Sequence, residues 1–461
     1  MYKINLETPI HVHFIGIGGI SMSALAQLLL NRGFRVTGSD IGNNGSIKKL
    51  TTMGAHIYKG HHQDHITSDI DLIVYTVAIK LDNPEIEKAN KMDIPIIDRG
   101  TLLGQVMDGY ENSIAVSGTH GKTTTTSMIA HILTSAQTEP TVMVGGILPL
   151  IGGNVAVGKS PFIVTEACEY FDSFHHFFPK ISVILNVEED HMDYFRDIHH
   201  IHDSFHTFLE NTKTDGSIVI NADIKDAHLI LRETTKKITT YSLTNANCDF
   251  YGTNIVYNSL GHGAFDVIYK NQSIGRFQLS VPGDHNISNA LAAIATAVEL
   301  NIDLASIALG LCAFTGTHRR FQYKGSLGGV HIVDDYAHHP TEIEATIKST
   351  ANMDFNKLWI VFQPHTFTRT KAFLDDFAKS LSLADHVILM DIYSAGREAD
   401  FGDIHARDIQ SRILAYGTPC EYFSSFDEIS YHILTHCIPN DLLITMGAGD
   451  VYLLGEYLLD S

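Results

Sequence analysis

One pattern recurs along this 461-residue sequence: a short apolar run, a glycine or polar turn, and then a stretch of helical periodicity. The apolar runs cover residues 13–16, 113–116, 162–165, 183–185, 332–334, 358–362 and 442–445. Strands that alternate with helices form parallel sheets, which bind their ligands beyond the carboxyl ends of the strands. The sequence therefore predicts an α/β fold, with the functional side chains directly after the apolar runs.

The length of the chain exceeds what one hydrophobic core usually organises, which predicts several domains. Polar stretches near residues 107–112 and 315–324 are suitable joints. They divide the chain into three α/β domains, at residues 1–110, 111–317 and 318–461. Between about residues 240 and 282 polar and apolar residues alternate, with glycines among them, which predicts a small antiparallel addition to the middle domain.

Charge and cysteine content narrow the function classes. The 52 acidic and 32 basic residues give a net charge of −20, which repels nucleic acid and anionic membrane surfaces. No apolar run approaches membrane-spanning length, and the amino terminus lacks the apolar core of a signal peptide. The five cysteines show neither C-x-x-C spacing nor the density of a disulfide scaffold. We therefore expect a cytoplasmic protein, without a nucleic-acid partner or membrane insertion, that binds any polyanionic substrate through local loops.

The first glycine-rich loop, residues 16–21, precedes a helical pattern over residues 22–30. It nearly fits the dinucleotide fingerprint, with Ser21 in place of the third glycine and Asp40 at the end of the next predicted strand. Such a loop brings backbone N–H groups and a helix amino terminus up to a diphosphate. The spacing alone leaves open a nicotinamide or flavin cofactor, another nucleotide diphosphate, or a structural turn. The candidate residues are Gly16, Gly18, Gly19, Ile20, Ser21 and Asp40.

The second loop predicts a phosphate-binding site. It opens a helical pattern over residues 124–133, although Val116 stands where the usual phosphate loop has its first glycine. Lys122 would hold the terminal phosphates as a point charge, and the Thr123 hydroxyl would bind Mg²⁺. The alternative, an exposed lysine at a helix start, does not explain the four threonines that follow a glycine and a lysine behind a strand. The candidate residues are Gly118, Thr119, His120, Gly121, Lys122, Thr123 and Thr124.

Carboxylates and a histidine follow the next two predicted strands. Glu166 ends one of these strands, and His191 lies shortly after the other. Such groups beside a phosphate loop can hold hard cations against ATP oxygens, whereas capping or surface ion pairing is the alternative for each. Four further acidic residues in these segments are interpreted as supporting or solvated: Glu169, Glu188, Glu189 and Asp193.

Four motifs taken together resemble the ATP-dependent Mur ligase family over essentially the whole chain. They lie at residues 118–123, at 166–169, at 186 with 190–193, and at 285–293. The resemblance implies a three-domain Mur ligase architecture. In this architecture a Rossmann-like amino-terminal domain is expected to bind a UDP-sugar, a central phosphate-loop domain with a parallel sheet to bind ATP and Mg²⁺, and a Rossmann-like carboxyl-terminal domain to bind an amino acid. The first glycine loop is thereby reassigned to UDP.

Further motifs most resemble the branch of this family that joins L-alanine to UDP-N-acetylmuramate through an acyl phosphate, in peptidoglycan precursor synthesis. These motifs lie at residues 13–23, 319–321, 334–342 and 362–365. The resemblance implies that Lys122 steadies the β and γ oxygens of ATP, that Thr123 and Glu166 hold one Mg²⁺, and that His191 holds a second metal ion. It also implies that the nucleotide is bound across the joint of the second and third domains by Asn289, Arg320 and Asp335.

The amino-acid pocket is expected after the apolar run 358–362. Arg369 offers a planar guanidinium that a carboxylate accepts in two parallel hydrogen bonds, with His365 in the same loop. Tyr336 and His338 would surround the small side chain. An arginine that caps its own helix or pairs at the surface is the alternative, and Arg397 is then the next candidate for the carboxylate.

Two departures bear on the branch and on the substrate. Some branches carry a metal-binding lysine about a dozen residues after the 190–193 segment, and none occurs from residue 192 to 212, an absence that the alanine-adding branch shares. Thr366 and Ala337 replace a common arginine and a common glycine near the expected amino-acid pocket. A ligase of the same family that attaches a preformed peptide is therefore a close alternative, and a dinucleotide-dependent oxidoreductase is the alternative from another class.

The histidine-rich segments 61–65 and 199–202 have spacings that can bind zinc. Neither follows a predicted strand end or has cysteine partners, so we interpret both as structural or surface features. His175 and His176 lie among phenylalanines and are expected to pack against them.

Overall fold

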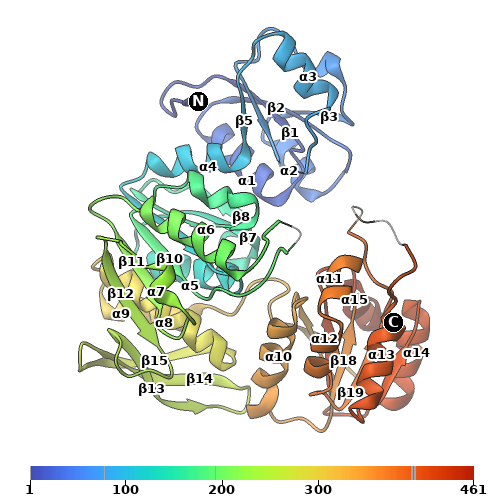
Figure 1. Ribbon diagram of the computed structural model, residues 1–461. Coiled ribbons are helices and arrows are strands. Elements are labelled where there is room, and N and C mark those ends of the chain that lie inside the picture. Colours follow the sequence, from blue (N-terminus) through green and yellow to red (C-terminus); the bar gives the residue numbers. More distant parts are fainter. Residues whose placement is uncertain (1, 77, 193, 396–397, 399–400, 461) are drawn as a thin grey trace. The chain divides into compact units, whose positions relative to one another are not determined.

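The computed structural model describes residues 2–76, 78–192, 194–395, 398 and 401–460. It is an α/β structure with a five-stranded, a ten-stranded and a six-stranded sheet, as the recurring pattern predicted (Figure 1). The chain forms two compact units. The first unit contains Met1–Thr253, Asp266–Phe277 and Ser288–Phe314, and the second contains Asn254–Phe265, Gln278–Ile287 and Thr315–Ser461. The three domain boundaries given above stay a prediction.

The five-stranded sheet is entirely parallel, in the order β3-β2-β1-β4-β5. Alternate residues of a strand point to opposite sides of the sheet, and helices cover both sides. Val12 and Phe14 pack with α1 and α4, whereas Ile15 packs with α3. Its elements are β1 (His11–Ile15), α1 (Ile20–Asn31), β2 (Arg35–Asp40), α2 (Gly45–Thr52), β3 (His56–Lys59), β4 (Leu72–Tyr75), α3 (Pro84–Lys91), β5 (Ile96–Asp98) and α4 (Arg99–Asp108).

The ten-stranded sheet has the order β15-β14-β13-β12-β11-β10-β6-β9-β7-β8. Strand β6 lies between β10 and β9 and is parallel to both, so the three carboxyl ends meet at one edge. Helix α5 follows β6 directly. The elements are β6 (Asn112–Ser117), α5 (Lys122–Ser135), β7 (Thr141–Leu148), β8 (Gly153–Ala156), β9 (Phe162–Glu166), β10 (Ile181–Ile184), α6 (Ile198–Glu210), β11 (Ser217–Asn221), α7 (Ala227–Ile230), β12 (Lys237–Ser242), β13 (Phe250–Tyr257), β14 (His262–Tyr269), β15 (Gln272–Pro282), α8 (Asp284–Glu299) and α9 (Leu304–Ala313).

The predicted addition near residues 240–282 corresponds to β13, β14 and β15, which are consecutive neighbours at one edge of this sheet. Strands β14 and β15 are separated by two residues, a connection that joins antiparallel neighbours.

The six-stranded sheet has the order β16-β17-β21-β18-β19-β20, with β16 antiparallel and the other pairs parallel. Val333 and Ile360 pack with α10, α12 and α13, and Ile332 and Trp359 pack with α14 and α15 on the other face. Its elements are β16 (Gln322–Leu327), β17 (Val330–Asp335), α10 (Pro340–Ser349), β18 (Leu358–Phe362), α11 (Phe367–Ala372), α12 (Leu374–Leu381), β19 (His386–Leu389), α13 (Ala406–Ala415), β20 (Cys420–Tyr422), α14 (Phe426–His436), β21 (Leu442–Met446) and α15 (Tyr452–Asp460).

Among the residues that the structure describes, no helix combines the length and the apolar character needed to cross a membrane.

Candidate functional site

The phosphate loop joins β6 to α5, and its two glycines are required by its shape. Gly118 and Gly121 have φ values of 140° and 83°, which side chains rarely adopt. A Cβ on Gly118 would lie 3.0 Å from the Cβ of Leu185, and one on Gly121 would lie 2.6 Å from Oδ1 of Asn289. The loop thus lies directly against β10 and α8. Asn289, predicted from the sequence, is brought to the same loop.

Asn186 braces this loop, a role that the sequence did not reveal. The His120 N–H donates to Asn186 Oδ1 at 2.7 Å, and the Asn186 amide donates back to the His120 carbonyl at 3.0 Å. The Thr119 N–H donates to the Asn186 carbonyl at 3.2 Å. These bonds fix the backbone conformation of the loop before any ligand binds.

Lys122, the first residue of α5, is largely buried and points back into its own loop. Its ammonium donates to the carbonyl oxygens of Gly118 and Thr119, and to both carboxylate oxygens of Glu169 at 3.2 and 3.1 Å. Burial alone would lower the pKa of Lys122, but Glu169 and further acidic groups nearby raise it. Lys122 is therefore a fully charged cation. Glu169 is buried and pairs with it, so it supports the loop and is not solvated.

Glu166 ends β9, next to the phosphate loop, and is held by the chain on its other side. The Gly145 N–H donates to Glu166 Oε1 at 2.5 Å, and a Cβ on Gly145 would lie 3.0 Å from Glu166 Oε2. A Cβ on the next residue, Gly146, would lie 3.6 Å from Cγ2 of Thr123. Segment 145–146 of β7 therefore lies beside both predicted Mg²⁺ ligands. A carboxylate and a hydroxyl are the oxygen donors that Mg²⁺ prefers, so this donor set fits the ion.

His191 lies in the loop after β10, with a φ of 53°. Its ring stacks on Tyr170 with centroids 4.4 Å apart. The main-chain N–H of His191 donates to Asp190 Oδ1 at 2.7 Å. A non-glycine residue at positive φ is uncommon and is often found at functional sites. The stacking fixes the direction of the imidazole. Asp193, named above as supporting or solvated, lies outside the described residues.

The first glycine loop is held by Asp40. The Gly18 N–H donates to Asp40 Oδ2 at 2.8 Å, and a Cβ on Gly18 would lie 2.8 Å from the same oxygen. The other carboxylate oxygen accepts from the Gly42 N–H at 2.8 Å. Helix α1 begins at Ile20, which is 52% exposed, and the carbonyl of Ile20 accepts from the Asn154 amide of β8 at 2.8 Å. The loop therefore presents an accessible helix amino terminus, as a diphosphate site requires.

The four predicted amino-acid-binding residues lie together in the second unit. The ring centroid of His338 is 5.2 Å from that of Tyr336 and 5.6 Å from that of His365. Arg369 Nη1 lies 3.4 Å from His365 Nδ1, and His365 also stacks on Tyr393 at 5.8 Å. Tyr393 was not predicted, because it follows a different strand, β19, and is separated in sequence from the motifs.

The two departures from the family pattern are both buried: Thr366 is 4% exposed and Ala337 is 1% exposed. Thr366 has a φ of 65°, and its N–H donates to the carbonyl of Tyr393 at 2.8 Å. A β-branched residue at positive φ is strained, so this turn stores conformational energy beside the predicted amino-acid pocket.

Arg320 and Asp335 also belong to the second unit. Arg320 Nη1 lies 3.7 Å from Glu342 Oε1. Asp335 accepts from the N–H groups of Phe321 and Ala337, both at 2.8 Å. Burial raises the pKa of Asp335 to about 6, although Arg320 and these N–H groups lower it. The joint binding of a nucleotide by these residues with Asn289 stays a prediction.

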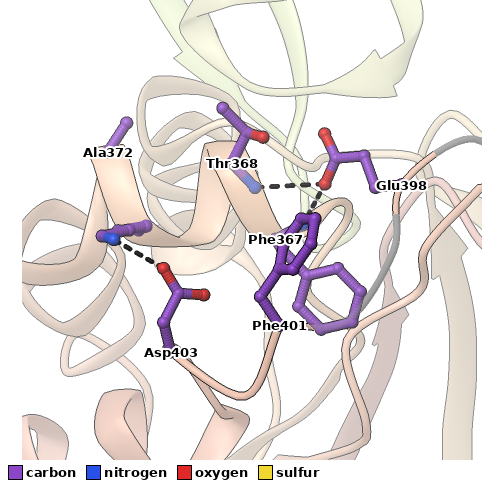
Figure 2. Close-up of a pocket in the computed structure, with 7 residues that line it drawn as sticks. Phe367, Thr368, Ala372, Glu398, Phe401 and Asp403 are labelled. Atoms are coloured by element: carbon purple, nitrogen blue, oxygen red, sulfur yellow. Dashed lines mark hydrogen bonds and ion pairs between the residues drawn. The ribbon is translucent and has the colours of Figure 1, made fainter.

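A cavity of about 620 Å³ lies beside α11 (Figure 2). Glu398 Oε2 accepts from the N–H groups of Phe367 at 2.6 Å and Thr368 at 3.1 Å, and Lys371 pairs with Asp403 at 2.6 Å. Glu398 thus accepts hydrogen bonds from the otherwise unpaired N–H groups at the amino terminus of α11, the helix that carries Arg369. Arg397, the second candidate for carboxylate binding, lies outside the described residues. The lining residues are Phe367, Thr368, Lys371, Ala372, Glu398, Phe401 and Asp403.

The first histidine-rich segment surrounds a buried carboxylate. Glu85 is fully buried, and it accepts from Ser39 Oγ at 2.6 Å and contacts His65 Nδ1 at 2.5 Å and His61 Nδ1 at 3.3 Å. The interpretation of this segment as structural agrees with these contacts. His175, which was expected to pack against phenylalanines, stacks on Phe174 with ring centroids 5.1 Å apart.

Comparison with known proteins assigns each part of the chain to one family. The model described as Mur ligase family, catalytic domain, matches residues 11–111. The Mur ligase middle domain matches residues 116–297, and the Mur ligase, glutamate ligase domain, matches residues 319–449.

Relatives of known name match from end to end. A UDP-N-acetylmuramate--L-alanine ligase of Agathobacter rectalis is 49% identical over 459 residues, covering 100% of both chains. The ligase of the same name from Acetivibrio thermocellus is 48% identical, covering 97% of this chain and 95% of that one. The solved UDP-N-acetylmuramate-alanine ligase of Thermotoga maritima is 29% identical, with a TM-score of 0.82 over 98% of both chains. A murein peptide ligase of Psychrobacter arcticus is 26% identical, with a TM-score of 0.71 over 98% of both chains.

Proposed function

Because the chain belongs to the Mur ligase family, we propose that it uses ATP to join L-alanine to the lactyl carboxylate of UDP-N-acetylmuramate, a step of peptidoglycan precursor synthesis. The observation that carries this function is the match to a UDP-N-acetylmuramate--L-alanine ligase at 49% identity over all of both chains. The murein peptide ligase is less similar in sequence and in fold, which favours the single amino acid over a peptide. The buried lysine of the phosphate loop disfavours the oxidoreductase alternative, which has no use for it.

The first chemical step transfers the γ-phosphoryl group of ATP to the carboxylate of UDP-N-acetylmuramate, and ADP leaves. Phosphoryl transfer needs positioning and charge neutralisation more than covalent catalysis. Lys122 is suited to this task because it is charged, largely buried and fixed at the start of α5. The loop residues 118–124 surround the phosphates: Asn186 holds the N–H groups of Thr119 and His120, and the first turn of α5 supplies N–H groups to the phosphates.

A bound Mg²⁺ would neutralise the negative charge of the phosphates. Thr123 and Glu166 would hold this ion, and His191 would hold a second metal ion. Tyr170 keeps the His191 ring in one orientation by stacking.

In the second step the amine of L-alanine attacks the acyl phosphate carbon, phosphate leaves, and an amide bond is formed. Arg369 binds the carboxylate of L-alanine, and Tyr336, His338 and His365 enclose its methyl group. Asn289, Arg320 and Asp335 bind the nucleotide of ATP. UDP is bound at the first glycine loop through Gly16, Gly18, Gly19, Ile20, Ser21 and Asp40. We assign the reaction to the cytoplasm, the compartment expected from the cysteine pattern of the sequence.

Incubation with ATP, Mg²⁺, UDP-N-acetylmuramate and L-alanine should release phosphate and yield a product heavier by one alanyl residue, detected by mass spectrometry. Lys122→Ala should lower the rate on the order of a hundredfold or more, because one preorganised electrostatic contact is lost. Lys159→Ala, which removes an exposed lysine of the same unit, is the matched control and should retain the rate. Phosphate release with a preformed peptide but not with L-alanine would replace this proposal by the peptide ligase, and tight NAD(H) binding without ATP dependence would refute both.

A further inference from the structure

Glu169 lies three residues after Glu166 and is 3% exposed. Its two carboxylate oxygens accept from the Lys122 ammonium at 3.2 and 3.1 Å. The carbonyl oxygens of Gly118 and Thr119 accept from the same ammonium. Every one of these acceptors belongs to the phosphate loop or to the strand end beside it. The ammonium is therefore held by its own loop and by the segment that follows β9.

The contacts use all of the ammonium's hydrogen-bonding capacity. Lysine has three N–H donors, and here they face the four oxygens of Gly118, Thr119 and Glu169. A phosphate oxygen can bind Lys122 only if one of these contacts is given up. The carboxylate carries a full negative charge, so Glu169 is the group that competes most directly with a phosphate.

We propose that Glu169 is a positioning residue that holds Lys122 in the nucleotide-free protein, and that ATP binds by replacing this carboxylate at the ammonium. The inference rests on the proposed function, in which Lys122 contacts the terminal phosphates. The pair has two opposite effects. It keeps a buried cation partnered when ATP is absent, because an unpaired buried charge is unstable. It also opposes the approach of ATP, most strongly when no cation offsets the charge of the phosphates.

Calorimetric titration with ATP, in EDTA and in Mg²⁺, tests the exchange in wild type, Glu169→Gln and Glu169→Asp. Glu169→Gln keeps the shape of the side chain and removes its charge, so it should bind ATP in EDTA about tenfold more tightly, the worth of a hydrogen bond to a charged group. Its nucleotide-free form should melt at a lower temperature. Glu169→Asp places the carboxylate one methylene farther from the ammonium and should bind ATP with an intermediate affinity. If Glu169→Gln does not fold, the affinity of Glu169→Asp for ATP in EDTA tests the proposal by itself, and an affinity no higher than that of wild type overturns it.

Glu189→Gln is the matched charge control, because Glu189 is exposed in the loop after β10 and should leave the affinity for ATP unchanged. The proposal is overturned if Glu169→Gln binds ATP in EDTA no more tightly than wild type. A loss of affinity confined to Mg²⁺ would make Glu169 a metal ligand and would also overturn it. If wild type binds no ATP, both this proposal and the proposed ligase function are refuted. If Glu169→Gln binds ATP more tightly but the wild-type protein does not ligate L-alanine, only the proposed ligase function is refuted.

Discussion

Replacing Gly310 by alanine should destabilise the helix that carries the phosphate loop. Gly310 is buried in α9, which packs along α5. A Cβ at this position would lie 2.5 Å from the Cα and 2.7 Å from the N of Ile132 in α5. Because these are backbone atoms, no change of side-chain rotamer can relieve the clash. Either α9 or α5 must move.

The size of the effect follows from these distances. Carbon atoms in contact are normally about 3.5–4.0 Å apart, so the helices must separate by about 1 Å. Overpacking of this kind costs about 1–3 kcal/mol, and alanine offsets up to about 1 kcal/mol through its higher helix propensity. Since the clash is with backbone, we expect a net loss of about 2 kcal/mol, or about 4–8 °C in Tm for a domain of 150–250 residues.

Thermal unfolding followed by circular dichroism, with and without ATP, measures this loss. Gly455→Ala in α15 is the matched control, because its Cβ would meet its nearest neighbour, Cγ2 of Ile332, at an ordinary 3.4 Å. This control should leave the protein as stable as wild type or slightly more stable. Trp359 is the single tryptophan and belongs to the second unit. The melting temperature that its fluorescence reports should change little when Gly310 is replaced.

A Gly310→Ala variant that melts at or above the wild-type temperature would refute the packing argument, provided that Gly455→Ala behaves as expected. A lower melting temperature that appears only in the tryptophan signal would also contradict it, because the change would then lie in the wrong unit.

Three further predictions concern the other sites. Gly18→Val should weaken binding of UDP-N-acetylmuramate and leave ATP binding intact in calorimetry, because its Cβ would displace Asp40 from the loop; the reverse result would remove the UDP assignment. Arg369→Ala should raise the KM for L-alanine strongly without affecting acyl phosphate formation, measured without L-alanine as exchange of labelled ADP into ATP, and an unchanged KM would refute its role. Burial opposes ionisation of Glu85, but hydrogen bonds from neighbouring histidines and Ser39 lower its pKa to about 2 from 4.5. The ionised carboxylate therefore stabilises the fold by about 3 kcal/mol above pH 4.5, and this contribution is lost as the pH falls toward 2. Glu85→Gln should thus be less stable than wild type in urea at neutral pH, and a difference that does not shrink in acid would contradict the assignment.

The sequence by itself determined the class of fold and the position of the loops. Apolar runs of strand length, followed by turns and helical periodicity, specify alternating strands and helices through local geometry alone. Gly118 and Gly121 could be recognised because their pattern reports a local requirement, backbone at positive φ in front of a helix. Lys122 and Thr123 follow from the same local pattern. The family resemblance added the ligands, and the relatives confirm the family and the function.

The tertiary structure decided which of the polar residues meet. Strand β6 lies between β9 and β10, so Glu169 and Asn186, from two different segments, reach the same loop. Glu169 and the exposed Glu189 look alike in sequence, since both are acidic residues shortly after a strand. Burial separates them, and burial depends on the order of strands in the sheet and on long-range packing. No local pattern encodes that order, so the counter-ion of Lys122 became visible only in the folded chain.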